Sequence, residues 1–588
     1  MILQALTAYC EELRKQGRLS SPGWDSGYKV SYELRLNDAG ELIQVVDLRT
    51  VRQMGKKQVT VPREIPVPTR EKRASGIASN LLSDNSTYLL GVDEKGKPER
   101  SINCFKDCAA RHHNLLDGVD SPAAKAILAF FDHWQPEKAS EHPQIAPLFR
   151  DLVGAANLIF GYEAPNGKHY LCVDDEHIRS AWDAHKESAG ADADYIQCLV
   201  TGQQAPLARL HPAIKGVAGA QSTGASLVSF NAPAFCSYNR DQGENAPVGE
   251  YAAAAYTAAL NWLVADRDHC KRIGDTTVVC WAENAQDVYQ DAMNMFLFGE
   301  EADERLTDAD VSHALKELSE GRDVSFLDGR LAANQHFYVL GLAPNAARLS
   351  VRFFLRDTFG AFAKNLQRHA EALEIVRPDY DKRITLPIWA LAAETVNRKE
   401  RNPSPAPQLA GDLLRAVLTG GRYPATLLNG VTLRIRAEQE VTRGRAAIIK
   451  AYYLRNEPSN ERLKEAFTVK LNEETNYTPY ILGRLFEVLE EIQEKANPGI
   501  NTTIRERYFN AACATPALAF PTLINLTQKH LNKLNSSSEI YYNKQLTELL
   551  GRLEETYPAH LTLPEQGAFQ IGYYHQQQKR YMKKNEEE

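Results

Sequence analysis

Residues 336–366, HFYVLGLAPNAARLSVRFFLRDTFGAFAKNL, contain the pattern that decides the fold class. From position 347 to position 355 every odd residue is apolar, and arginine or serine stands at positions 348, 350 and 352. Strict alternation with β-branched and aromatic residues predicts a strand. Asp357 or Thr358 then supplies the cap of a following helix. A strand that leads directly into a helix predicts a mixed chain, which we place in the α+β class.

Three arginines, Arg348, Arg352 and Arg356, fall on the polar side of this alternation, which Phe354 interrupts. The alternation predicts that they line one face of a sheet. Arginine is favoured at phosphates because its planar fork donates two parallel hydrogen bonds. The two interpretations are therefore a contact to a nucleic-acid backbone and ordinary ion pairing at the surface.

A second informative stretch, residues 199–245, mixes glycines, amides, hydroxyls and a few cations with two short apolar runs. These runs predict short strands at 197–200 and 225–230. Glycines at 216, 219 and 224 permit positive φ or a close approach to a partner, and the polar side chains suit phosphate oxygens and base edges. The alternative is an ordered connecting loop with a structural role only. The candidate contact residues are Lys215, Gln221, Ser222, Thr223, Asn231, Tyr238, Asn239, Arg240 and Gln242, together with Asn85 at the end of another expected strand.

Two enzyme motifs fail in this stretch. A Walker loop needs Lys and then Ser or Thr after its last glycine, but Ala225 and Ser226 follow Gly224. A nucleophile elbow needs G-x-S-x-G at a strand-to-helix turn, whereas residues 220–224 read AQSTG and lead into an expected strand. A hydrolase centred on Ser222, or on the acidic cluster from Asp174 to His177, stays open as an alternative, although such a cluster is most often a solvated edge.

Length and composition indicate a soluble, globular chain of several domains. The 588 residues carry a net charge of −7, which argues against a protein that coats nucleic acid unaided. No stretch reaches the roughly 18 apolar residues of a membrane helix, and the helix expected at the N-terminus lacks the basic start of a signal peptide. Nine scattered cysteines fit a reducing cytoplasm. Cys104, Cys108 and His112 share a helix face, which allows metal ligation but more often marks core packing.

The first 400 residues alternate between strand and helix patterns. Hairpins are expected at 28–48, about a turn at 37–40, and at 156–175, about Asn166 and Gly167. The basic, proline-containing residues 56–73 predict an extended, exposed connector. A buried strand is expected at 275–283, and helices are expected at 104–116, at 249–267 and over most of 287–328.

The pattern changes after residue 400. A proline-rich linker, RNPSPAPQLAG, opens a basic connecting segment at 401–458, and the period becomes helical from residue 459. Capping signals mark helix starts near residues 478, 503, 515, 538 and 563. The sequence therefore predicts a large α+β region at 1–400 with an antiparallel β-sheet and helices, the connecting segment, and a C-terminal α-helical bundle at 459–588.

Five segments together resemble one known family. They are MILQALTAYCEEL at 1–13, DNSTYLLG at 84–91, LHPAIKGVAGAQSTGASLVSFNAPAFCSYNRDQG at 210–243, ARLSVRFFLRDTFG at 347–360 and YILGRLFEVLEEIQ at 480–493. In this order they resemble the large subunit of the type I-C CRISPR Cascade surveillance complex, essentially from end to end.

The resemblance implies a non-catalytic, cytoplasmic subunit of a crRNA-guided complex. Such a subunit recognises the PAM in target double-stranded DNA, helps to unwind it, stabilises the R-loop and supports recruitment of a helicase-nuclease. The implied partners are crRNA, target DNA, that nuclease and the backbone, handle-binding and small subunits of Cascade. No membrane, cofactor or metal is implied. A purely architectural subunit, with the PAM read elsewhere, is the remaining alternative.

Side-chain chemistry, applied to the segment that carries the resemblance, predicts roles for the candidate residues. Gln221, Asn231, Asn239 and Gln242 would bond base edges, and Lys215 and Arg240 would hold phosphates. The C-terminal bundle resembles the Cascade small subunit, which lines the path of the guide–target duplex and the displaced strand. Its phosphate-facing candidates, with solvated helix faces as the alternative, are Arg484, Lys495, Arg505, Arg507, Lys529 and Lys533.

Overall fold

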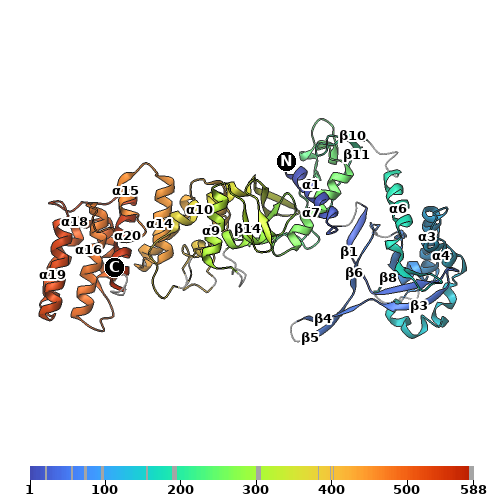
Figure 1. Cartoon of the computed structure of the whole chain (residues 1–588), viewed down its shortest axis with the longest axis horizontal. Helices are drawn as coiled ribbons and strands as arrows, with labels where there is room; N and C mark the ends of the chain where they lie inside the picture. The colour runs from blue at the N-terminus through green and yellow to red at the C-terminus, as the bar shows by residue number, and fades with distance from the viewer. Residues whose placement is uncertain are drawn as a thin grey trace. The chain divides into compact units, whose positions relative to one another are not determined.

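The computed structural model describes residues 1–581 except 20–22, 55–56, 72–75, 94–97, 154–155, 189–194, 299–305, 382, 384, 398 and 402. Strands and helices are mixed in the first 400 residues, and helices follow (Figure 1), which confirms the α+β prediction. The chain divides into two compact units. The first contains Met1–Pro212 and Val228–Ala259, and the second contains Ala213–Leu227 and Leu260–Glu588. No helix in the described part of the chain is long and apolar enough to cross a membrane.

The first unit is built on a five-stranded sheet. Its strands are β2 (Tyr32–Leu36), β3 (Leu42–Asp47), β7 (Ser83–Asn85), β8 (Asn157–Glu163) and β9 (His169–Leu171). All pairs are antiparallel except β2 with β8, and both predicted hairpins, β2–β3 and β8–β9, are confirmed. Two helices, α3 (Pro98–Leu116) and α4 (Pro122–His133), contribute to the same core, where Leu34, Ile127 and Phe160 are fully buried.

The remaining strands of the first unit form two-stranded ribbons, and further helices accompany them. They are α1 (Ile2–Lys15), β1 (Trp24–Val30), β4 (Thr50–Met54), β5 (Lys57–Val61), β6 (Arg63–Pro68), α2 (Ser86–Leu89), α5 (Phe149–Val153), α6 (Glu176–Ser188), β10 (Tyr195–Gln197), β11 (Gln204–Pro206) and most of α7 (Glu250–Ala265). The connector predicted at 56–73 is extended as expected, and Val59 and Thr60 of β5 are exposed, but β5 and β6 are both paired strands and the expected exposure is wrong for β6. Strand β6 pairs with β1 and buries Ile65 and Val67. Its prolines are tolerated because each strand of a two-stranded ribbon is an edge strand. Residues 56, 72 and 73 lie outside the described part.

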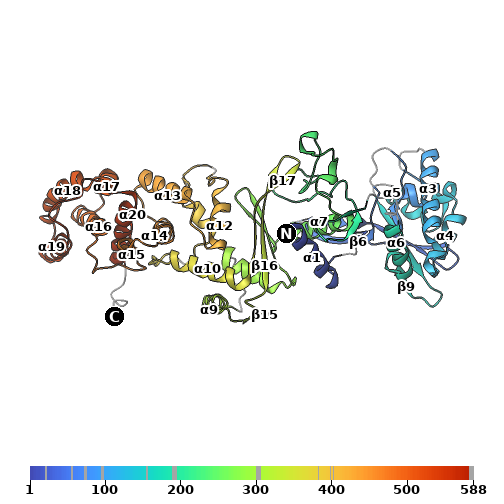
Figure 2. The same ribbon diagram turned by 90° about the horizontal axis from the view of Figure 1, so that it is seen from above.

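The second unit contains an antiparallel sheet in the order β12 (Cys270–Ile273), β13 (Thr276–Ala282), β16 (His336–Asn345) and β17 (Arg348–Thr358). Figure 2 shows β16 and β17 as a long pair beside α10 (Phe359–Leu373). Every residue of β13 is buried, as predicted. Thr358 caps α10 by accepting from the Ala361 N–H, as predicted. On one face of the sheet, Val278 and Val339 belong to the same buried core cluster as Phe362 of α10.

The three arginines of β17 do not share a face, contrary to the alternation. In the register, Arg348 pairs with Asn345 and Arg356 pairs with Tyr338. These partners are seven residues apart on β16 (345 − 338), an odd separation, so they point to opposite faces. A bulge next to the Gly341–Phe353 pair leaves Arg352 without an opposite residue and reverses the alternation.

Three other segments differ from the predictions. Residues 287–328 contain α8 (Val288–Met293), a π-helical turn (Asn294–Phe298) and α9 (Asp308–Ser319), but also β14 (Val324–Phe326), which pairs with β15 (Gly329–Leu331). In the first unit β10 spans Tyr195–Gln197, so the strand predicted at 197–200 is wrong after Gln197, where a turn follows. The strand expected at 225–230 is wrong: only isolated bridges form there, at Ala225 and Ser226.

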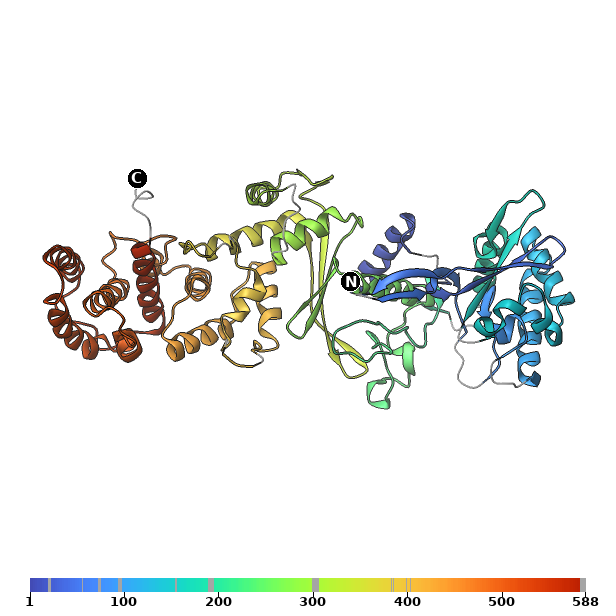
Figure 3. The same ribbon diagram turned by 90° about the horizontal axis from the view of Figure 1, so that it is seen from below.

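Helices fill the rest of the second unit and are grouped together in Figures 2 and 3. They are α11 (Ile388–Ala393), α12 (Leu409–Thr419), α13 (Ala425–Glu438), α14 (Arg443–Asn456), α15 (Glu461–Ala466), α16 (Thr478–Ala496), α17 (Ile504–Ala514), α18 (Pro516–Leu531), α19 (Ser536–Gly551) and α20 (Leu563–Tyr581). The starts predicted near 478, 503, 515 and 563 are confirmed, whereas α19 begins earlier than Ser538 because Asn535 is its cap.

Candidate nucleic-acid interface

Residues 237–240 of the first unit form a tight turn that presents Tyr238 and Asn239 to solvent. The Arg240 N–H donates to the Ser237 carbonyl at 3.0 Å, and the two central residues have φ of 55° and 57°. Positive φ at both central positions defines a type I′ turn, which favours Asn but is unusual for Tyr. Tyr238 is 94% exposed. The backbone of Tyr238 therefore has an energetically unfavourable conformation, and its aromatic ring is exposed to water.

The turn is held by Asn245 and by a close backbone contact. The Asn245 side chain accepts from the Ser237 N–H at 2.9 Å and donates to the carbonyls of Arg240 at 3.0 Å and Gln242 at 3.1 Å. A Cβ on Gly243 would lie 2.3 Å from the Ala208 carbonyl oxygen, so only glycine fits. The sequence reasoning missed both positions. The sequence gives only a weak signal for Asn245, because Asn is common near turns whether or not its side chain holds the turn.

Charged and amide groups surround this turn. Arg240, Asn239 and Asn231 are exposed, while Gln242 is half-buried with φ of 44°. The carboxylates of Asp241 and Glu244 are engaged in a capping box of the short 3₁₀ helix Gln242–Asn245. Asp241 and Glu244 are exposed as well, so the turn presents one aromatic ring, amides and one guanidinium beside two carboxylates that are partly engaged by backbone N–H groups.

The glycine-rich loop belongs to the second unit. Its ends are tied by two hydrogen bonds between Ile214 and Ala225, and the Ala218 N–H donates to Thr277 Oγ1 on β13 at 3.2 Å. Ser226 bridges to the start of β17. Twelve residues, 214–225, thus form a compact loop anchored on a sheet, a form that is frequently functional.

The apex of this loop holds the predicted contact residues. Gln221, Ser222 and Thr223 are exposed, and the Gly224 N–H closes the apex on the Gln221 carbonyl at 2.9 Å. Gly224 has φ of 102°, a value that only glycine adopts without strain. Lys215 is also exposed, while its backbone N–H is fixed by Asn261 Oδ1 at 2.7 Å.

Asn85 has a local structural role. Its side chain accepts from the Thr87 N–H at 3.1 Å and caps α2, and the residue is half-buried. The side-chain oxygen of Asn85 is therefore already engaged at the N-terminus of α2.

The arginines of β17 make ion pairs. Arg352 lies 3.1 Å from Asp275, and Arg356 lies 4.0 Å from Glu283 and over the Tyr338 ring at 5.8 Å. Both guanidinium groups stay partly exposed, at 39% and 48%. Exposed pairs of this kind contribute little stability and break readily, so these arginines remain available to phosphate.

The cations of the C-terminal helices fall into two classes. Arg484 is 3% exposed, donates to Gln576 at 3.1 Å, and lies 3.8 Å from Glu473, so its guanidinium holds α16 to α20. Arg505 is half-buried and faces Glu490 at 3.7 Å. The side chains open to solvent are Lys495, Arg507, Lys529 and Lys533.

Two positions are candidates for catalysis. Asp175 has structural hydrogen-bond partners, and Ser222 has no catalytic partner among the described residues. Asp175 caps α6: it accepts from the N–H groups of His177 and Ile178, both at 3.0 Å, and from Ser121 Oγ at 2.8 Å. Within the described residues, the Ser222 hydroxyl contacts no histidine or carboxylate, and no group of three or more His, Cys, Asp or Glu is arranged to hold a metal ion.

Cys104, Cys108 and His112 pack in the core of the first unit, which fits the packing interpretation. His112 Nε2 accepts from the Leu82 N–H at 3.0 Å, and Nδ1 lies 2.8 Å from the Cys108 carbonyl oxygen, to which it donates. Burial lowers the pKa of His112 to about 4, so the imidazole is neutral.

Comparison with known proteins covers nearly the whole chain. The model of a family described as CRISPR-associated protein (Cas_Csd1) matches residues 6–581. No curated protein matches the chain.

Proposed function

The chain belongs to the Cas_Csd1 family of CRISPR-associated proteins, and from this premise we propose that it is the non-catalytic large subunit of a type I-C Cascade. In this proposal it acts in the cytoplasm, with crRNA and the other Cascade subunits, and recognises the PAM in target double-stranded DNA. It then helps to open the duplex, stabilises the R-loop and supports recruitment of the helicase-nuclease. The single observation that supports PAM reading best is the exposed type I′ turn with Tyr238 and Asn239 at its tip.

The turn has the chemistry that reading a short duplex motif requires. An exposed ring on a fixed backbone can enter a base step and unstack it, as apolar wedges do in proteins that kink DNA. The Asn239 amide can bond a base edge, and Arg240 can bond an adjacent phosphate. A rigid turn makes these contacts at a low entropic cost, because its backbone is already ordered.

The glycine-rich loop offers a second set of amides and hydroxyls. Gln221, Ser222 and Thr223 project from a backbone anchored at both ends, and Lys215 supplies a cation. With a net charge of −7 the chain as a whole does not attract a polyanion. Its affinity for duplex would therefore depend on these local contacts and on guide pairing.

The experiment uses the assembled complex with Tyr238→Ala. We expect at least a tenfold loss of affinity for a target duplex with a PAM, and no change for a target whose strands are already separated. Tyr380→Ala, which removes an 86% exposed tyrosine from another loop, is the matched control. If Tyr238→Ala and Asn239→Ala both leave PAM discrimination intact in a complete complex, the chain is an architectural subunit instead.

A further inference from the structure

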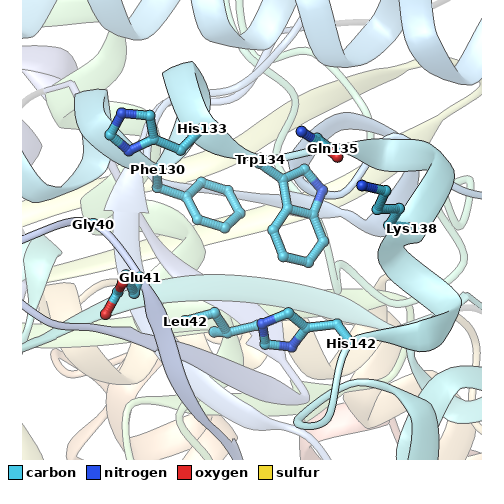
Figure 4. Close-up of a pocket in the computed structure, with 9 residues that line it drawn as sticks. All are labelled: Gly40, Glu41, Leu42, Phe130, His133, Trp134, Gln135, Lys138 and His142. Atoms are coloured by element: carbon cyan, nitrogen blue, oxygen red, sulfur yellow. The ribbon is translucent and has the colours of Figure 1, made fainter.

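An aromatic cavity of 260 Å³ lies in the first unit, between the β2–β3 turn and the end of α4. Figure 4 shows the rings of Phe130 and Trp134 on one side and Leu42 and His142 on the other. The lining also includes Gly40, Glu41, His133, Gln135 and Lys138. The proposed function uses none of these residues.

The walls of this cavity are fixed by specific contacts. The Trp134 indole N–H donates to the Leu90 carbonyl at 3.0 Å, which sets the plane of the ring. Phe130 stacks on Trp134 with ring centroids 5.1 Å apart, and His142 lies 5.4 Å away on a tilted plane. Gly40 has φ of 76°, and a Cβ there would lie 2.5 Å from the Phe130 backbone nitrogen. The turn can therefore approach α4 only because residue 40 is glycine.

Polar groups stand around the aromatic wall. Lys138 and His133 are exposed, and their side chains make no hydrogen bond or ion pair within the described part of the chain. Glu41 is exposed and accepts from the Asn37 amide at 2.9 Å, which leaves its other oxygen open. The cavity thus offers a flat apolar face, one lysine cation, an imidazole and a carboxylate acceptor.

From this combination we infer that the cavity binds one unpaired nucleobase that carries an exocyclic amino group, stacked on the side of Trp134 that Phe130 does not cover. The amino group donates to Glu41, and Lys138 holds the neighbouring phosphate. Every base has a flat face that stacks on aromatic rings. A carboxylate accepts from the exocyclic amino groups of cytosine, adenine and guanine, whereas thymine and uracil offer only a ring N3–H, so the bases with amino groups are preferred over thymine and uracil.

The size of the cavity agrees with one base rather than a larger ligand. Pockets for drug-sized molecules span roughly 300 to 1,000 Å³, and this cavity is smaller. Lys138 lies on a 3₁₀ helix (Pro136–Glu141) directly after Trp134 in the chain, which places a cation beside the stacking ring. Arrangements of aromatic rings and neighbouring cations recur in proteins that bind single strands.

This inference rests on the proposed function only in placing single-stranded nucleic acid on this chain. It is tested with the full purified chain and short labelled oligonucleotides, by fluorescence anisotropy. Oligo(dC) and oligo(dA) should bind more tightly than oligo(dT). Parallel arms with oligo(C) and oligo(U) show whether an RNA or a DNA strand is the tighter ligand.

Three variants probe the three parts of the cavity. Trp134→Leu keeps apolar volume but removes the stacking face, and should weaken oligo(dC) binding about 5- to 150-fold. Lys138→Gln should lower the slope of log affinity against log salt by about 0.7. Glu41→Gln should reduce the preference for oligo(dC) over oligo(dT). The matched controls are Trp389→Leu, at a 60% exposed tryptophan in the second unit, and Lys125→Gln, at an exposed lysine on α4.

The outcomes separate this inference from the proposed function. Equal oligo(dC) binding by Trp134→Leu and Trp389→Leu, or oligonucleotide binding without base preference, overturns the inference whatever the PAM assay shows. If Trp134→Leu does not fold, Lys138→Gln and Glu41→Gln decide, because both positions are exposed. A loss of PAM discrimination in Tyr238→Ala with normal oligonucleotide binding supports both sites as separate contacts.

Discussion

The side-chain amide of Asn245 donates to the Arg240 carbonyl at 3.0 Å, while its oxygen accepts from the Ser237 N–H at 2.9 Å. One side chain therefore binds both ends of the turn that exposes Tyr238. The turn needs such a support because both of its central residues have positive φ, which costs energy for non-glycine residues.

Asn245→Ala should weaken PAM-duplex binding without unfolding the protein. The change removes three hydrogen bonds worth about 1 kcal/mol each, so a less ordered turn should lower affinity by roughly fivefold if one bond's worth of energy is felt in binding, and by up to about 150-fold if all three are. The measurement is duplex affinity of the assembled complex beside its thermal midpoint. Asn543→Ala on an exposed part of α19 is the control, and equal affinity of the two variants would contradict a supporting role for Asn245.

The pairing of Arg352 with Asp275 gives a test of phosphate contact on β17. If Arg352 binds a phosphate, Arg352→Gln should lower duplex affinity and reduce the salt slope by about 1. Asp275→Asn should act in the opposite direction, because it releases the guanidinium from its 3.1 Å ion pair. If the pair is only structural, both variants leave affinity unchanged and each shifts stability by under about 1 kcal/mol.

Gly483 should tolerate no side chain, because α16 and α20 cross there. A Cβ on Gly483 would lie 1.9 Å from the Phe569 carbonyl oxygen and 2.8 Å from the Tyr573 nitrogen, both backbone atoms of α20. Gly483→Ala must separate the helices, and should cost about 1–3 kcal/mol or more.

Hydrogen exchange of α16 and α20 in the full chain measures this cost. Gly551→Ala is the matched control, since nothing lies within 4 Å of its Cβ position on α19. This control should be neutral or stabilising by up to about 1 kcal/mol. Similar exchange in the two variants would refute the close crossing.

Glu487 should make the protein less stable as pH rises. Burial raises the pKa of this carboxyl to about 8, with a further contribution from Glu491, despite Arg580 at 3.7 Å. Between pH 4.5 and 8 the folded state then holds one proton more than the unfolded state. The free energy of unfolding therefore falls by up to about 1.4 kcal/mol per pH unit across this window.

Thermal midpoints of wild type and Glu487→Gln at several pH values test this assignment. The glutamine variant keeps a neutral side chain, so its advantage over wild type should grow from pH 4.5 to 8 and then level off. A midpoint difference that is constant with pH would mean that Glu487 is ionised in the folded protein.

The helices and strands could largely be predicted from sequence because their signals are local. The alternation at 347–355 predicted β17, and the pair Thr503 and Glu506 predicted the start of α17. Asn166 and Gly167 predicted the β8–β9 turn. Each signal involves residues only a few positions apart. Prediction failed where pairing partners were distant, as for β6, whose partner β1 lies about 40 residues earlier in the chain (65 − 28 for Ile65 and Tyr28).

The candidate site was predicted as a list of residues but not as a geometry. The exposure of Tyr238 depends on Asn245 and on the fit of Gly243 against Ala208, 35 residues earlier (243 − 208). The pairing of Arg484 with Gln576 spans 92 residues, and no local pattern indicates that this arginine is buried. Trp134 and Lys138 likewise gave no signal, because their cavity forms only when α4 meets the β2–β3 turn.

By itself the sequence determined the α+β class, most helix and strand positions, and the residue types able to bind nucleic acid, since periodicity and capping act over a few residues. Only the tertiary structure decided which of those side chains face solvent, that Arg348 and Arg356 point to opposite faces of the sheet, and that residues 213–227 and 228–245 belong to different compact units. The physical reason is that burial, register and turn strain are set by contacts between residues far apart in the chain, which no local pattern contains.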